Sequence, residues 1–339
     1  MPNNPTKILL STTLIGGILI SISSNSWLGA WMGLEINLMS FIPLMSSQEN
    51  IFTTEASLKY FIIQALASST LMFLVMMKAL INNSLMTETS LYEHAIMIPL
   101  LLKMGAAPLH WWFPSVMEGL SWNNCFIMMT VQKAAPMMLS SYLLKSNNLI
   151  MMVILMSVVV GSMGGINQLS VRKILTYSSI NHTGWMLMAL VGGSNTWILY
   201  FTIYFLLTLT TTTIAKTFNI SFINQTMSMN SKAPIKMMMF SSLLSLGGLP
   251  PFTGFLPKWI VIQTMITNNM NFLTTVMVVT SLITLFYYLR ICYSSFVVLH
   301  SEVKWTRHQN EEMSLTQSVM LTSMSTLGLM ACTMIMNIN

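Results

Sequence analysis

The chain contains no aspartate and very little charge of either sign. Its 339 residues include nine acidic side chains, all glutamate, and charged residues make up 7% of the total. Soluble domains carry roughly 25% charged residues, so this scarcity excludes an ordinary soluble globular protein. Hydrophobic residues make up 54%, and the mean hydropathy is +0.66. These values indicate an integral membrane protein.

Sequence signatures of bound cofactors are also absent. Cys125, Cys292 and Cys332 lie far apart with no Cys-x-x-Cys pair, so we expect free apolar thiols without a disulfide or metal site. There is no Gly-x-Gly-x-x-Gly or P-loop motif, and no cluster of cysteine or histidine suits an iron–sulfur centre, haem or zinc. The net charge of +6 comes from a few scattered cations, which favours an oriented membrane protein over a nucleic-acid-binding one.

Long apolar segments separated by short polar clusters fill the chain instead. A membrane helix needs roughly 20 mostly apolar residues, and eleven segments meet this requirement. We therefore predict an all-α polytopic membrane protein that forms a single domain over 1–339. The predicted spans are 6–23, 26–46, 53–81, 93–118, 124–144, 149–167, 172–192, 196–218, 235–270, 272–299 and 314–336.

The cations near the ends of these spans predict their orientation. Eight of them fall on the side of the membrane that holds the N-terminus, against only Lys78 and Lys145 on the opposite side. Because cations concentrate on the cytoplasmic side of a membrane, we expect the N-terminus on the equivalent side and the C-terminus opposite. The eight cations are Lys7, Arg172, Lys173, Lys216, Lys232, Lys236, Lys304 and Arg307.

Two of the predicted helices are broken, near 105–108 and near 247–257. The pattern Gly-x-x-Pro-x5-Pro begins at Gly105 and recurs at Gly248, 143 residues later. Such breaks free backbone N–H and C=O groups that hydrocarbon cannot satisfy, so each must be packed inside protein or face a watery cavity. Paired interruptions of this kind are typical of transporters built from repeats.

Four ionisable residues lie deep within apolar segments: Glu35, Lys103, Lys133 and Lys258. Glu35 is about 12–17 Å from either end of its predicted helix, too far for a short side chain to reach the interface. An uncompensated charge at the bilayer centre costs ~2.5–3.5 kcal/mol, so these groups must pair, lose their charge or line water. We predict that they move protons. The alternative is a static salt bridge, or lysines that extend to the interface.

Two histidines are weaker candidates for the same chemistry. His110 follows the first break, and His182 lies in the middle of the chain. Histidine can relay protons near neutral pH, although a lone membrane histidine is more often a hydrogen-bonded packing residue. Lys59 and Arg290 lie toward helix ends, where extension of the side chain to the interface explains them equally well.

The chain resembles the antiporter-like membrane subunits of respiratory complex I, in a mitochondrially encoded form of arthropod type. The resemblance covers nearly the whole chain and rests on the motifs at 26–37, 55–61, 102–114, 132–136, 177–185 and 246–259. The 35 methionines also suit a mitochondrial genetic code. The resemblance implies an antiporter-like fold that lacks the first three helices of the bacterial form.

The resemblance also implies a function. Such a subunit moves protons through a mid-membrane chain of ionisable residues, here from Glu35 and Lys103 through Lys133 to Lys258, with His110 and His182 less certain. It implies that NADH, FMN, iron–sulfur clusters and ubiquinone belong to the rest of the complex and that this chain holds no cofactor. The implied partners are other complex I subunits, especially neighbouring antiporter-like and small membrane-arm subunits, and membrane lipids.

The implied location is the mitochondrial inner membrane, with the N-terminus in the matrix and the C-terminus in the intermembrane space. Two alternative functions stay open. The first is a stand-alone cation/proton antiporter that uses the same residues. The second is a structural membrane-arm subunit whose charges fix helix packing. A metal-cation exchanger needs oxygen ligands, whereas this chain has one deep carboxylate and three deep lysines, which favours protons.

Overall fold

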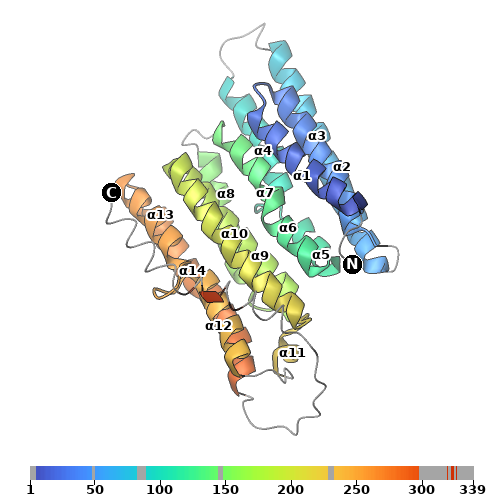
Figure 1. The fold of residues 1–339 in the computed structure, drawn as a ribbon. Helices are drawn as coiled ribbons and strands as arrows, with labels where there is room; N and C mark the ends of the chain where they lie inside the picture. The colour runs from blue at the N-terminus through green and yellow to red at the C-terminus, as the bar shows by residue number, and fades with distance from the viewer. Residues whose placement is uncertain are drawn as a thin grey trace. The chain divides into compact units, whose positions relative to one another are not determined.

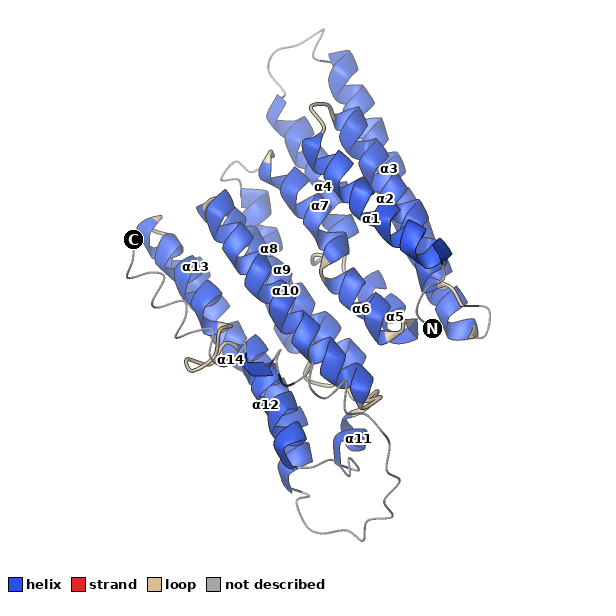
Figure 2. Ribbon diagram, viewed as in Figure 1, coloured by secondary structure: helices blue, strands red, loops and turns tan. Residues whose placement is uncertain are grey.

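The computed structural model describes residues 5–47, 50–81, 89–143, 148–227 and 233–297, together with residues 319, 322, 323 and 326. Within these ranges the regular structure is helical, apart from one isolated antiparallel bridge between Ser170 and Phe222. Figure 1 colours the helices by their position in the chain, and Figure 2 colours the same view by secondary structure. The all-α class is therefore confirmed for the described residues. The predicted span 314–336 lies almost entirely outside them.

The helices belong to two compact units, residues 1–157 and 158–339. The first unit contains α1 (Pro5–Ser23), α2 (Trp27–Met45), α3 (Ile51–Ile81), α4 (Thr89–Met104), α5 (Trp112–Gly119), α6 (Trp122–Met129) and α7 (Val131–Ser141). The unit boundary falls within α8 (Asn148–Gly164). The second unit contains α9 (Val171–Gly192), α10 (Ser194–Thr217), α11 (Ile223–Met227), α12 (Ala233–Gly247), α13 (Phe255–Thr267) and α14 (Asn271–Val297).

Seven predicted spans coincide with single helices, namely α1, α2, α3, α8, α9, α10 and α14, to within three residues at either end. The segment predicted as a loop over 219–235 contains the short helix α11. Among the described helices, those long and apolar enough to cross a membrane by length and composition are α1, α2, α10 and most of α3 and α14.

The pair α1 and α2 shows how these helices pack. A Cβ added to Gly33 would lie 2.5 Å from the backbone nitrogen of Ser21, and one on Gly17 would lie 2.9 Å from the carbonyl oxygen of Gly33. Side chains are therefore excluded where the two backbones meet. Small residues serve this purpose in membrane proteins, because close backbone packing replaces the hydrophobic effect as the source of helix association.

The two predicted breaks have closely similar backbone geometry. α4 ends at Met104, directly before Gly105, and α12 ends at Gly247, directly before Gly248. Both of these following glycines have left-handed backbone angles, with φ of +69° and +79°. Glycine is the residue that most readily adopts this conformation, and it commonly ends a helix in this way.

Hydrogen bonds at the two helix ends are also equivalent. After α4, the N–H of Ala106 donates to the carbonyl of Leu101, and after α12 the N–H of Leu249 donates to the carbonyl of Leu244. In each case the glycine N–H donates to the carbonyl three residues earlier, at 3.1 Å. This pair of bonds is the Schellman arrangement, which satisfies carbonyls that a helix end would leave free. Helical structure resumes at α5 and α13, each with proline as its third residue.

A third interruption was not indicated by the sequence. The span predicted over 124–144 is divided into α6 and α7 at Thr130. Pro136 lies within α7, has no N–H for the carbonyl of Gln132, and its ring crowds that carbonyl. We attribute the break to this proline, because sharp irregularities in helices are usually found in the turn before proline. Lys133 consequently lies in the first turn of α7 rather than in the middle of a continuous helix.

Replacement of Gly33 by alanine should weaken the α1–α2 contact, because the new methyl group meets backbone atoms that cannot rotate away. Overpacking of this kind costs ~1–3 kcal/mol. We expect less of the variant to assemble into its membrane complex and a lower temperature of dissociation, measured by native electrophoresis after graded heating. Gly16→Ala is the matched control, since its Cβ would have nothing within 4 Å. Equal behaviour of the two variants would contradict this packing interpretation.

Candidate functional site

Lys103 lies in the last turn of α4 and is only 6% exposed. Neighbouring side chains donate hydrogen bonds to the carbonyls at this helix end. The indole Nε1 of Trp112 donates to the carbonyl of Leu102 at 3.2 Å, and the amide Nε2 of Gln64 donates to the carbonyl of Lys103 at 3.4 Å. Neutral donors thus satisfy the backbone here, and the ammonium group of Lys103 is not needed for that purpose.

Glu35 is the charge that acts on Lys103. Its carboxylate attracts the Lys103 ammonium across the first unit, so the structure brings these two predicted residues within electrostatic range. Glu35 is half-buried on α2 and lines a groove of about 640 Å³ whose wall is otherwise mostly apolar. The groove is formed by Leu9, Leu10, Thr13, Trp31, Glu35, Ile36, Met39 and Ser40.

Lys133 is the most deeply buried of the three lysines, at 1% exposure. Its Nζ lies 4.8 Å from the centroid of the Phe113 ring on α5. A cation over an aromatic face is attracted by the ring quadrupole, more strongly where water is excluded. The break at Thr130 places Lys133 in the first turn of α7, where it lies against Phe113 of α5 in the interior of the first unit.

A network of neutral polar side chains adjoins these charges and was missed in the sequence. The amide Nε2 of Gln132 donates to Oδ1 of Asn37 at 3.0 Å, and the hydroxyl of Tyr60 donates to Oε1 of Gln132 at 3.2 Å. All three residues are buried, and together they join α2, α3 and α7. Gln132 directly precedes Lys133, and Asn37 follows Glu35 by two positions. The network therefore fixes the helices that carry both ionisable residues.

Lys258 is buried in the first turn of α13, in the second unit. Its Nζ donates to the carbonyl oxygen of Gly247 at 2.8 Å, at the end of α12. The same nitrogen lies 5.8 Å from the centroid of the Trp185 ring. Trp185 is fully buried on α9. The ammonium group is thus held between a helix end and an aromatic face.

The two histidines are both buried and both bonded. Nδ1 of His182 shares a hydrogen bond of 2.8 Å with the hydroxyl of Tyr200, and its ring lies 5.0 Å from that of Tyr204. Nδ1 of His110 lies 3.2 Å from the carbonyl of Pro108, and its ring stacks on Trp111. These contacts suit both a packing residue and a relay, so the relay role of the histidines stays a prediction.

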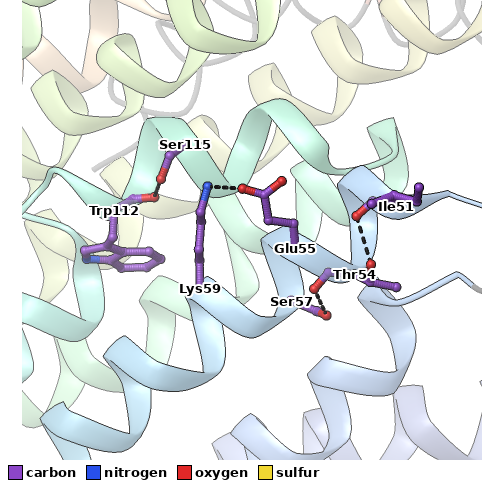
Figure 3. Close-up of polar contacts among 7 residues, drawn as sticks. All are labelled: Ile51, Thr54, Glu55, Ser57, Lys59, Trp112 and Ser115. Carbon is purple, nitrogen blue, oxygen red and sulfur yellow. Dashed lines mark hydrogen bonds and ion pairs between the residues drawn. The ribbon is translucent and has the colours of Figure 1, made fainter.

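Lys59 and Arg290 have local partners. Lys59 pairs with Glu55 one turn earlier on α3, with 2.6 Å between Nζ and Oε1, and both side chains are exposed (Figure 3). An exposed pair of this kind contributes little to stability. Arg290 on α14 donates to the carbonyls of Ile166, at 2.6 Å, and Gln168. These hydrogen bonds hold the turn that follows α8, so Arg290 has a structural role.

The described residues offer no obvious place for a metal ion. Within the described part of the chain, no three His, Cys or Glu side chains gather as a potential ligand set. Cys125 and Cys292 are buried and are not joined in a disulfide, and Cys332 lies outside the described residues.

A family model and individual known proteins relate this chain to the same family. The family model for the transmembrane region of the NADH:quinone oxidoreductase/Mrp antiporter family matches residues 24–284. NADH-ubiquinone oxidoreductase chain 2 of Anopheles gambiae is 49% identical over 300 residues, which cover 88% of each chain. The same subunit of Locusta migratoria is 44% identical over 334 residues, which cover 98% of this chain and 97% of the relative.

Solved structures share the fold at lower sequence identity. A chain of respiratory complex I from Thermus thermophilus superposes with a TM-score of 0.79 at 23% identity, covering 95% of this chain and 78% of that one. A chain of the Mrp complex from a Dietzia species has the same TM-score at 16% identity, covering 96% and 75%. These similarities support the antiporter-like membrane fold.

Replacement of Tyr60 by phenylalanine should loosen the Tyr60–Gln132–Asn37 network. The ring contacts remain, but Gln132 loses one hydrogen bond, for a net cost of about 0.5–1.5 kcal/mol. We expect the assembled protein to dissociate at a temperature lower by a few degrees, measured by light scattering or native electrophoresis. Tyr142→Phe is the control, because Tyr142 is 65% exposed. Identical midpoints for both variants would contradict a stabilising network.

Proposed function

The chain belongs to the NADH:quinone oxidoreductase/Mrp antiporter family, and from this premise we propose that it is a proton-translocating membrane-arm subunit of NADH:ubiquinone oxidoreductase. Relatives that carry the name of chain 2 of that enzyme align over nearly the whole length. The observation that carries the proposal is the burial of three lysines, Lys103, Lys133 and Lys258, within an apolar helical protein. A buried charge in a membrane protein is costly, and it marks an ion or proton pathway.

We assign the proton-carrying role to these lysines together with Glu35. Glu35 is within electrostatic range of Lys103, and its carboxylate attracts the ammonium group. Lys133 and Lys258 each face an aromatic ring, whose quadrupole attracts a cation.

The proposal includes the architecture of the membrane domain. α4 with α5, and α12 with α13, would each form one broken transmembrane helix within a single antiporter-like domain of about eleven crossings. The matching Schellman ends and matching prolines support this view. The distribution of cations supports an N-terminus in the matrix and a C-terminus in the intermembrane space.

Redox chemistry would take place elsewhere in the enzyme. NADH, FMN, iron–sulfur clusters and ubiquinone are assigned to other subunits, and this chain would use the energy that their reaction releases. Its partners would be the neighbouring antiporter-like and small membrane-arm subunits, in the lipid of the mitochondrial inner membrane.

Replacement of Lys133 or Lys258 by methionine tests the proton-carrying role. Methionine fills similar space but cannot carry a proton, so we expect proton transport by the assembled complex to fall about tenfold or more. The measurement is proton uptake per NADH oxidised in sealed membrane vesicles. Lys59→Met is the control, because Lys59 has an exposed local partner in Glu55. Normal transport in both deep-lysine variants would reject the role.

The same variants also distinguish the proton-carrying role from a purely structural role of the lysines. A complex that fails to assemble, while the residual assembled fraction transports protons normally, would show that the lysines fix helix packing. An intact complex that oxidises NADH but transports few protons would support the proposed role.

The size of the native particle distinguishes a subunit from a free antiporter. After mild detergent extraction, we expect the chain to migrate with the full NADH-oxidising complex on a native gel stained for NADH dehydrogenase activity. Migration near the mass of the single chain, 38.1 kDa, would favour the stand-alone cation/proton antiporter.

A further inference from the structure

The side chain of Lys258 lies directly across the end of α12. Its Nζ is bonded to the Gly247 carbonyl, and its outer atoms fill the space beside Gly248. A Cβ at position 248 would lie 2.9 Å from Cδ, 3.2 Å from Cε and 3.1 Å from Nζ of Lys258. Real Cβ atoms essentially never approach other atoms below 3.0 Å, so any side chain at this position would compete with the lysine.

Glycine at position 248 therefore meets two separate requirements. The first is the left-handed backbone angle of +79°, which ends the helix. Asparagine also adopts this conformation in proteins, so the backbone alone does not demand glycine. The second is the absence of a Cβ, which leaves room for the Lys258 chain. Only the second requirement concerns the function of the lysine.

The Gly247 carbonyl is a suitable acceptor for a cation. It belongs to the last turn of α12, where helix carbonyls lack partners within the helix and carry partial negative charge. At the end of α4, Trp112 and Gln64 donate to the carbonyls of Leu102 and Lys103, which precede the last residue of that helix. At the end of α12 the lysine itself provides a donor to the last residue of the helix.

We propose that the Gly247 carbonyl and Gly248 form a seat for the Lys258 ammonium, and that Gly248 is a positioning residue for proton transfer at Lys258. The inference rests on the proposed function of this lysine. In the seat, the ammonium is held by the carbonyl and by the face of Trp185. Proton transfer requires the Lys258 ammonium to break its hydrogen bond to the Gly247 carbonyl and to form it again. The absence of a side chain at Gly248 therefore determines how readily the ammonium occupies the seat.

The test compares Gly248→Ala with Gly193→Ala in the assembled complex. Alanine at position 248 introduces both backbone strain and crowding of Lys258. Alanine at position 193 introduces strain alone, because Gly193 has φ +138° and nothing within 4 Å of its Cβ position. Protons transported per NADH oxidised are measured in sealed vesicles over a range of pH.

We expect Gly248→Ala to lower the proton yield several-fold and to change the shape of its pH dependence. Gly193→Ala should leave the shape of the pH dependence unchanged, because its strain does not involve Lys258. In a Lys258→Ala background, Gly248→Ala should have no further effect, because the crowded side chain is gone. If Gly248→Ala alone fails to assemble, recovery of assembly in the Lys258→Ala background supports the seat.

Several results would overturn the inference. One is equal behaviour of Gly248→Ala and Gly193→Ala, and another is a loss of yield by the same factor at every pH. A further loss of yield or of assembly in the Lys258→Ala background would also overturn it. Failure of the proposed function gives a different result, namely normal transport by Lys258→Ala itself. A defective Lys258→Ala with a normal Gly248→Ala rejects the seat alone.

Discussion

The requirement that every backbone polar group find a partner inside an apolar protein governs this structure. A helix that stops within hydrocarbon leaves carbonyls without donors, and the ends of α4 and α12 meet this requirement in the same first step. In each case a glycine with a left-handed backbone angle ends the helix, and two N–H groups donate to carbonyls of the preceding turn. Other helices supply further donors to carbonyls at both helix ends. At α4 these are the neutral side chains of Gln64 and Trp112, and at α12 the donor is the ammonium of Lys258.

The surroundings of the three buried lysines differ in a way that distinguishes their roles. Lys103 is attracted by a carboxylate at longer range, Lys133 faces a phenyl ring, and Lys258 is bonded to a carbonyl. A carboxylate can itself gain or lose a proton, whereas a ring or a carbonyl cannot. Under the proposed function, Glu35 is therefore the candidate proton-exchange partner of Lys103. At Lys133 the ring, and at Lys258 the carbonyl and a second ring, attract the cation.

The sequence predicted those parts of the site that depend on local chemistry. Gly105 and Gly248 were recognisable because glycine and proline break helices wherever they occur, and Glu35 and the lysines because charge is conspicuous in apolar segments. The contacts of Gln132 were not predictable, since Asn37 is 95 residues away and Tyr60 is 72. Uncharged amides and phenols occur in many membrane helices without forming a network. The break at Thr130 escaped notice because proline is tolerated in membrane helices, and whether one opens the helix depends on its tertiary neighbours.

One asymmetry in the sequence is removed by the structure. Lys103 precedes the first break and Lys258 follows the second, which seems to spoil the correspondence between the two Gly-x-x-Pro-x5-Pro segments. Yet Lys103 lies in the last turn of α4, and the Lys258 side chain reaches back to the last residue of α12. In each unit a lysine therefore lies at the C-terminal end of the helix that precedes the break. That end carries partial negative charge from the helix dipole, so it favours a cation over an anion. Two different positions in the sequence thus reach one electrostatic environment, which accounts for the use of lysine, and not glutamate, at both breaks.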